Sequence, residues 1–189
     1  GGGYMPVSLE DCLVVGISSR ALFDLHKENE IFEQEGLQAY SEYQIAHEDE
    51  LLEPGSGFSL VKALLRLNEL SGRHVVEVII MSRNSADTSL RVFSSIEHYG
   101  LDITRAVLSG GENLSNYLAS FGVDLFLSAD EEDVQSAVNA GFAAGIIYPH
   151  ADDYQRKEIE QIRIAFDGDA VLFSDESERI YQEHGLDAF

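Results

Sequence analysis

Two carboxylates near the end of the sequence have the type and spacing for phosphoryl transfer. Asp167 and Asp169 flank Gly168, directly after an apolar run at residues 162–166. A carboxylate at a strand end can attack phosphorus and bind a metal ion, while a second, two residues on, can protonate the leaving oxygen and later accept a proton from water. Mg²⁺ suits such a site because it accepts a few oxygen ligands and keeps positions for phosphate and water. Taken alone, the same spacing also occurs in a solvated acidic turn.

The carboxylate pair belongs to one copy of an internal repeat. Residues 17–40 and 166–189 align without a gap, with identical pairs at Ala21/Ala170, Ile31/Ile180, Gly36/Gly185, Leu37/Leu186 and Ala39/Ala188. Where the second copy has Asp167 and Asp169, the first copy has Ser18 and Arg20. The first copy therefore cannot form an aspartyl-phosphate at that position.

The repeat suggests a domain organisation. We expect a complete first repeat at residues 5–149, an acidic linker at residues 150–161, and the start of a second repeat at residues 162–189 that is cut short at Phe189. An ordinary surface helix of a single domain is the alternative for the linker.

Short apolar runs alternate with segments of helical character along the first repeat. Strands are expected at residues 13–17, 75–81, 106–108, 123–127 and 143–147, and helices at residues 59–70, 85–99, 113–121 and 131–140. The spacing predicts buried helix faces at Leu60, Ala63, Leu64 and Leu67, and at Leu90, Phe93 and Ile96. Such alternation predicts an α/β fold with a parallel sheet and helices on both faces.

Polar groups follow four of the expected strands. They are residues 18–20, 82–84, 109–112 and 128–133. Because ligands of open α/β sheets bind at the carboxyl ends of the strands, we expect these four groups to lie close together.

Acidic residues dominate the composition. The chain has 34 Asp and Glu against 12 Lys and Arg, for a formal net charge of −22. Such a surface repels phosphate backbones and anionic headgroups, which argues against nucleic acid polymers and membranes as partners. Cys12 is the single cysteine, so no intrachain disulfide can form, and the reducing cytoplasm is the expected compartment. The dispersed histidines lack the spacing of metal ligands.

Several strings resemble the haloacid dehalogenase-like phosphohydrolases, and more closely the cytosolic 5′-nucleotidase type I family. FDGDAVLFSDESE at residues 166–178 resembles the nucleophile motif of that family. Five shorter strings resemble parts of the amino-terminal half of that family. They are SSRALFD, PGSGFSLVKALLRLN, MSRN, SGG and LSAD, at residues 18–24, 54–68, 81–84, 109–111 and 127–130. The resemblance implies a haloacid dehalogenase-like Rossmannoid sheet with a small cap inserted after the first strand, at roughly residues 24–53. It also implies Mg²⁺-dependent dephosphorylation of nucleoside monophosphates such as AMP or IMP.

Residue by residue, the resemblance makes Asp167 the nucleophile and Asp169 the acid/base, with both as metal ligands. Within the first repeat, Ser82 has the position of the phosphate-binding hydroxyl. Asp130 and Asp133 resemble the acidic metal pair, with a spacing one residue short of the usual pattern.

Arg20 could hold a phosphate in the first repeat, but Glu112 or Asn113 stands where a lysine would be needed. We therefore expect the first repeat to be a degenerate scaffold without catalytic activity. The alternative is that it still binds a ligand. For the chain as a whole, the alternative to catalysis is a non-catalytic module that binds a nucleotide or a partner subunit. A third hypothesis places Asp167 beside Ser82 and Asp130, within one molecule or across a homo-oligomer.

Overall fold

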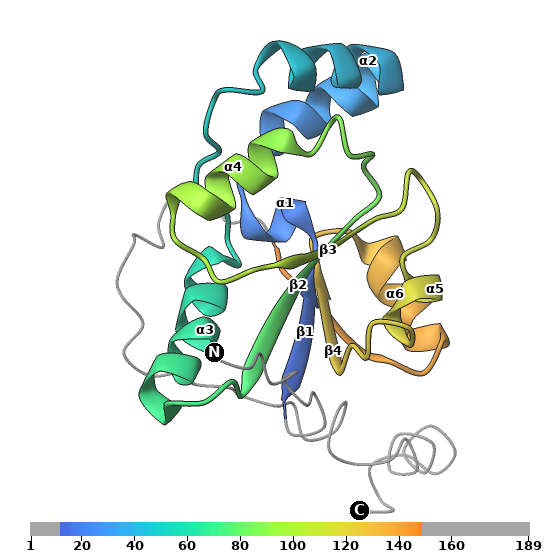
Figure 1. Cartoon of the computed structure of the whole chain (residues 1–189). Helices are drawn as coiled ribbons and strands as arrows, with labels where there is room; N and C mark the ends of the chain where they lie inside the picture. The colour runs from blue at the N-terminus through green and yellow to red at the C-terminus, as the bar shows by residue number, and fades with distance from the viewer. Residues whose placement is uncertain (1–11, 149–189) are drawn as a thin grey trace, which may run out of the picture.

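The computed structural model describes residues 12–148, which form a five-stranded parallel sheet flanked by helices (Figure 1). The strands are β1 (Leu13–Ile17), β2 (Val76–Ser82), β3 (Arg105–Leu108), β4 (Leu125–Ser128) and β5 (Ala143–Ile146). The helices are α1 (Ser19–Leu22), α2 (His26–Ala46), α3 (Phe58–Ser71), α4 (Leu90–His98), α5 (Ser115–Leu118) and α6 (Glu131–Asn139). The strand order is β3-β2-β1-β4-β5, and every pairing is parallel. The predicted α/β fold with a parallel sheet is confirmed.

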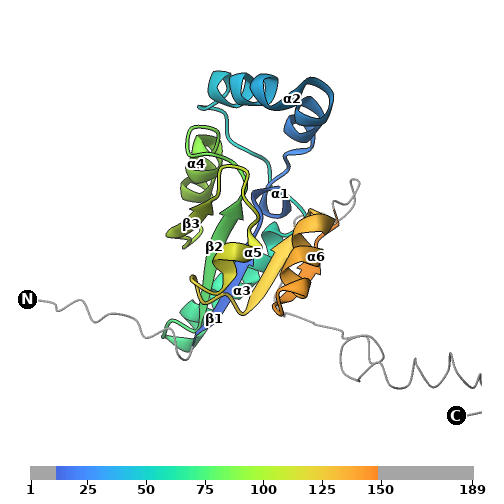
Figure 2. The same ribbon diagram turned by 90° about the vertical axis from the view of Figure 1, so that its right-hand side faces the viewer.

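Each face of the sheet has its own apolar core, because successive side chains of a strand point to opposite faces. On one face, Val15 and Ile80 pack with α3 and α4. On the other face, Val14 and Phe126 pack with α5 and α6. Figure 2 shows α3 and α6 on opposite sides of the strands. Helices therefore cover both faces, as the sequence predicts.

The predicted buried faces of two helices are partly wrong. α3 does bury Ala63 and Leu64, but Leu67 is exposed, and Val61 and Leu65 are buried instead. α4 begins five residues later than expected, at Leu90 instead of residue 85. Its buried positions, apart from Ile96, are Arg91, Val92 and Ser95, while Leu90 and Phe93 are exposed. The buried Arg91 explains why the wrong face of α4 was predicted to be buried, because spacing rules assume that buried positions are apolar.

Residues 24–53 leave the sheet after α1 and return to it through a narrow neck. The backbone N–H of Asp24 donates to the carbonyl of Glu53 at 2.8 Å, and Phe23 and Pro54 form an antiparallel bridge. The N–H of Gly55 donates to the carbonyl of Leu22 at 2.9 Å. Between the two chain segments that form the neck, α2 bends at Gly36, where φ is 86° and ψ is −178°. This excursion lies above the carboxyl ends of β1 and β2 (Figures 1 and 2).

The expected linker at residues 150–161 and the second repeat at residues 162–189, with Asp167 and Asp169, lie outside the described residues. Among the helices of residues 12–148, none is long and apolar enough to cross a membrane.

Candidate functional site

Four serines stand at the carboxyl edge of the sheet, where the strands end. They are Ser18 and Ser19 after β1, Ser82 at the end of β2, and Ser128 at the end of β4, and all four are buried. Because β1 lies between β2 and β4, their hydroxyls share one small region. This is the position at which open parallel sheets bind ligands.

Ser18 joins β1 to the loop after β4. Its Oγ accepts a hydrogen bond from the N–H of Ala21 at 3.2 Å, which caps α1, and another from the N–H of Ala129 at 3.2 Å. The backbone of Ser18 also donates to the carbonyl of Leu127 at 2.9 Å. The position aligned with Asp167 therefore lies between two backbone N–H donors.

Ser82 has a hydroxyl that neighbouring groups already engage. Its Oγ accepts from the N–H of Asn84 at 3.1 Å, and Ser19 Oγ donates to it at 3.4 Å. Arg20, the next residue along α1, is exposed and forms no ion pair within residues 12–148. The predicted phosphate-binding residues thus lie at the same edge of the sheet, while their roles remain predictions.

Asp133, which is buried, forms an ion pair with the partly exposed Arg83 in the loop after β2. Arg83 Nε donates to Asp133 Oδ1 at 2.8 Å, and Arg83 Nη2 contacts the same oxygen. Burial raises the pKa of the Asp133 carboxyl, while the hydrogen bond and charge of Arg83 oppose that rise. Asp130 caps α6, because its Oδ1 accepts from the N–H of Asp133 at 3.0 Å. Both acids of the predicted metal pair therefore have structural partners.

The loop after β3 packs against the loop after β2. Gly110 N–H donates to the carbonyl of Asn84 at 3.3 Å, and Gly111 N–H donates to that of Arg83 at 2.7 Å. Both glycines have positive φ, of 62° and 99°, which suits a tight turn. Their N–H groups are bonded within the fold, and the Glu112 carboxylate accepts from Tyr117 Oη. This loop therefore presents a negative charge, not the positive one that phosphate binding needs.

Comparisons with known proteins identify the family. The family model described as 5′-nucleotidase matches residues 5–189. The chain belongs to the 5′-nucleotidase family.

A human protein named cytosolic 5′-nucleotidase 1B is 40% identical to this chain over 190 residues. The alignment covers 97% of this chain and 31% of that protein, so the chain spans less than a third of that relative's length. Among solved structures, the HAD domain of the effector protein Lem4 from Legionella pneumophila, an inactive mutant, is similar with a TM-score of 0.46 and 13% identity. That similarity covers 76% of this chain and 88% of the Lem4 chain.

The described carboxyl edge of this 5′-nucleotidase family member gives little support for a magnesium site of its own. No three His, Cys, Asp or Glu side chains within residues 12–148 come close enough to share a metal. Asp133 forms an ion pair with Arg83, and Asp130 accepts a hydrogen bond from a backbone N–H at the N-terminus of α6. A metal role for Asp130 and Asp133 stays a prediction that this geometry does not favour.

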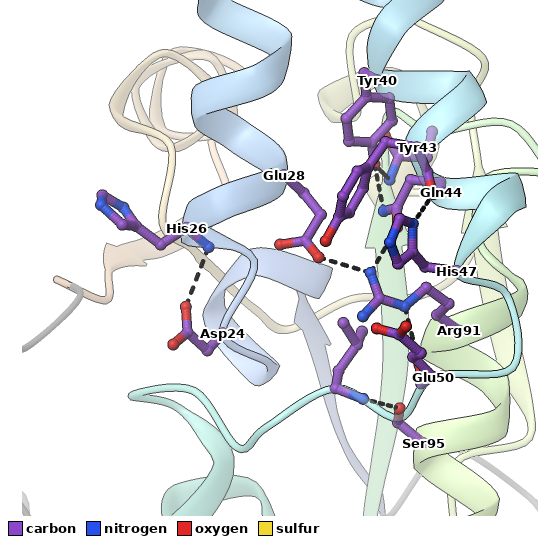
Figure 3. A network of polar contacts seen from close by, with 12 residues as sticks. Asp24, His26, Glu28, Tyr40, Tyr43, Gln44, His47, Glu50, Arg91 and Ser95 are labelled. Carbon is purple, nitrogen blue, oxygen red and sulfur yellow. Dashed lines mark hydrogen bonds and ion pairs between the residues drawn. The ribbon is translucent and has the colours of Figure 1, made fainter.

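Sequence reasoning missed a polar network that ties α2 to α4 (Figure 3). Arg91 Nη1 donates to Glu28 Oε1 at 2.6 Å and to Gln44 Oε1 at 3.1 Å, and Arg91 Nε donates to the carbonyl of Glu50 at 2.9 Å. One signal could have revealed it, since Arg91 and Ser95 share the helix face of Val92 and Ile96 at spacings of three and four.

A second contact couples α2 to the candidate site itself. Asn84 Nδ2, in the loop after β2, donates to Tyr40 Oη at 2.7 Å, and Gln44 Nε2 donates to the same oxygen at 3.1 Å. Burial raises the pKa of the Tyr40 phenol, and the two hydrogen bonds oppose that rise. The excursion is thus fixed to the residues beside Ser82 by neutral hydrogen bonds.

Proposed function

We propose that the protein is a 5′-nucleotidase that removes the 5′-phosphate from nucleoside monophosphates such as AMP or IMP. The observation that carries this proposal is the family match over residues 5–189, which includes Asp167 and Asp169. The 40% identity to a protein named cytosolic 5′-nucleotidase 1B supports it. A cytoplasmic location accords with that relative's name and with the single cysteine of this chain.

The repeat supports Asp167 as the nucleophile. Asp167 aligns with Ser18, whose Oγ accepts two backbone N–H bonds at the carboxyl edge of its sheet. In an equivalent position, a carboxylate would be held by the same kind of donors, which stabilise its ionised form. Asp169 aligns with Arg20, which lies on the exposed side of α1. An acid/base residue there would have access to substrate and water.

The proposed reaction has two steps. An Asp167 carboxylate oxygen attacks the phosphorus, the bond from phosphorus to the 5′ oxygen breaks, and Asp169 gives its proton to that oxygen as the nucleoside leaves. Asp169 then takes a proton from a water molecule that attacks the phosphorus of the aspartyl-phosphate. The bond between phosphorus and the Asp167 oxygen breaks, inorganic phosphate leaves, and the Asp167 carboxylate is regenerated. Mg²⁺, which we propose as the cofactor at this second-repeat site, would neutralise phosphate charge in a protein of net charge −22.

A second candidate function is a non-catalytic module that binds a nucleotide or another subunit, with a homo-oligomer as the assembly. It is favoured by one observation, that residues 12–148 have Ser18 where the carboxylate would stand and Arg83 on the Asp133 carboxylate. On that view, this repeat is a framework beside a catalytic unit.

Phosphate release from AMP with Mg²⁺, measured on the gene product as expressed in its host, tests the proposal. We expect turnover that Asp167→Asn abolishes, whereas Asp102→Asn, at an exposed position of the first repeat, leaves it unchanged. Unchanged turnover in Asp167→Asn would refute the assignment. Calorimetric binding of AMP to the 189-residue chain without phosphate release would favour the module.

A further inference from the structure

α2 has the reverse of the usual arrangement of a surface helix. Its buried side chains are Glu28, Tyr40 and Gln44. Three of its apolar residues, Phe32, Leu37 and Ile45, face solvent, with 48%, 67% and 48% of their surface exposed, while Ile31 is half-buried. A helix of a globular protein ordinarily buries its apolar stripe and exposes its polar one. The side of α2 that faces α4 and the loop after β2 is therefore polar, and these apolar side chains remain exposed.

We refer to the three exposed apolar side chains of α2, Phe32, Leu37 and Ile45, as the α2 surface. Leu37 and Ile45 are separated by two turns of helix, which places them within about a quarter-turn of each other. Phe32 precedes the bend at Gly36, and its ring meets the ring of Tyr40 edge to face with centroids 6.0 Å apart. The contact brings Phe32 beside the second half of α2.

The surroundings of the α2 surface are strongly acidic. Exposed carboxylates on α2 and directly after it are Glu30, Glu33, Glu35, Glu42, Glu48, Asp49 and Glu50. Lys27 is the one lysine or arginine between residues 26 and 50, and its ammonium lies over the Tyr43 ring at 4.9 Å. Apolar anchors surrounded by carboxylates complement a ligand with apolar anchors surrounded by cations.

We propose that the α2 surface docks a basic amphipathic helix of a partner protein. Helix recognition of this kind sets apolar residues of the ligand at helical spacing onto exposed apolar side chains, with charge at the rim. A second copy of the chain is a poor occupant, because it would bring the same carboxylates against these. The fixed polar network of Glu28 and Arg91 holds α2 in place, so docking needs no rearrangement of the helix.

Fluorescence anisotropy with a labelled peptide tests the proposal on the 189-residue chain. The probe is a short peptide of leucine and lysine with leucines at helical spacing, compared with a shuffled peptide of the same composition. We expect the triple variant Phe32→Ser, Leu37→Ser and Ile45→Ser to bind it at least about tenfold more weakly, because apolar burial is lost. Glu33→Gln with Glu35→Gln and Glu42→Gln should weaken binding and flatten its salt dependence.

A matched control is available on α3. Leu67 and Leu70 are exposed there too, but beside Lys62 and Arg66, so Leu67→Ser with Leu70→Ser should leave peptide affinity within about twofold. Circular dichroism checks that each variant keeps its fold. Equal affinity in the wild type and the α2 triple variant overturns the proposal, as does equal affinity for the shuffled peptide. A wild-type dimer that the triple variant converts to a monomer would make a second copy the occupant instead.

Discussion

Arg91 Nη1 donates to Glu28 Oε1 at 2.6 Å, and each of the two side chains is only 6% exposed. The pair joins α4, which packs on the sheet, to α2, which lies above it. Burying two charges is costly unless they are paired and hydrogen-bonded, and Gln44 and the Glu50 carbonyl accept further hydrogen bonds from Arg91. The attachment of the excursion therefore depends on both partners being present.

Arg91→Met should destabilise the protein strongly. It leaves the Glu28 carboxylate buried without its cation, so the free energy of unfolding should fall by about 3–5 kcal/mol in urea titrations. Arg66→Met, at an exposed position of α3, is the control and should change it by less than about 0.5 kcal/mol. The double variant Glu28→Leu with Arg91→Met should recover much of the loss, and a double variant no better than Arg91→Met would contradict this account.

The sign of the pH dependence at Asp133 follows from its surroundings. Burial raises the pKa of the Asp133 carboxyl above its ordinary value, and Arg83 holds the rise in check. Arg83→Gln should therefore raise that pKa further. When folding raises the pKa of a carboxyl, its contribution to the free energy of unfolding is largest at pH below the unfolded pKa, where the group is protonated. That contribution is lost as pH rises through the folded pKa.

We accordingly expect Arg83→Gln to be nearly as stable as the wild type near pH 3.5 and progressively less stable above it. At neutral pH the deficit should reach about 1–3 kcal/mol, reduced from the value for a fully buried pair because Arg83 is 39% exposed. Urea titrations across pH, with carboxyl NMR to follow Asp133, make the measurement. In the double variant Arg83→Gln with Asp133→Asn, the free energy of unfolding should depend less on pH than in Arg83→Gln alone. The same dependence in the single and the double variant would exclude Asp133 as the cause.

Much of the fold can be predicted from the sequence because the strands are short apolar runs that end in polar residues. The run at residues 13–17 is β1 with the expected bounds, and Ser82 and Ser128 end β2 and β4 where ligand-facing residues were expected. Parallel strands buried on both faces need continuous apolar runs, so such runs indicate where the central strands lie. The candidate site is located by the same rule.

The partners of those residues could not be predicted in the same way. Arg83 meets Asp133, and Arg91 meets Glu28, across long separations in sequence. Spacing rules predict which residues share a helix face. They do not predict which charged residue of another element packs against that face. The reversed arrangement of α2 has the same origin, because its polar side is buried against Arg91 and Asn84, which lie far from it in the sequence.

Gly55 should tolerate no larger residue at the neck of the excursion. A Cβ there would lie 2.7 Å from the carbonyl carbon of Phe23, which is backbone and cannot move aside cheaply. Gly55→Ala should lower the free energy of unfolding by about 1–3 kcal/mol in urea titrations, as overpacking does elsewhere. Gly145→Ala in β5 is the matched control, since its Cβ would lie 3.5 Å from a Leu127 methyl, an ordinary contact. Equal effects of the two substitutions would contradict the steric account.

Gly36 and Gly72 both have positive φ, yet they should respond differently to asparagine. Gly72 follows α3 at φ 66° and ψ 13°, a left-handed conformation that asparagine adopts readily. Gly36 has φ 86° and ψ −178°, a region open almost only to glycine. A Cβ would meet nothing within 4 Å at either position, so packing contributes nothing to the difference. Gly36→Asn should cost about 1–3 kcal/mol of unfolding free energy and Gly72→Asn less than about 1 kcal/mol. Urea titrations compare the two, and a cost at Gly72 equal to that at Gly36 would show that backbone strain does not set the bend of α2.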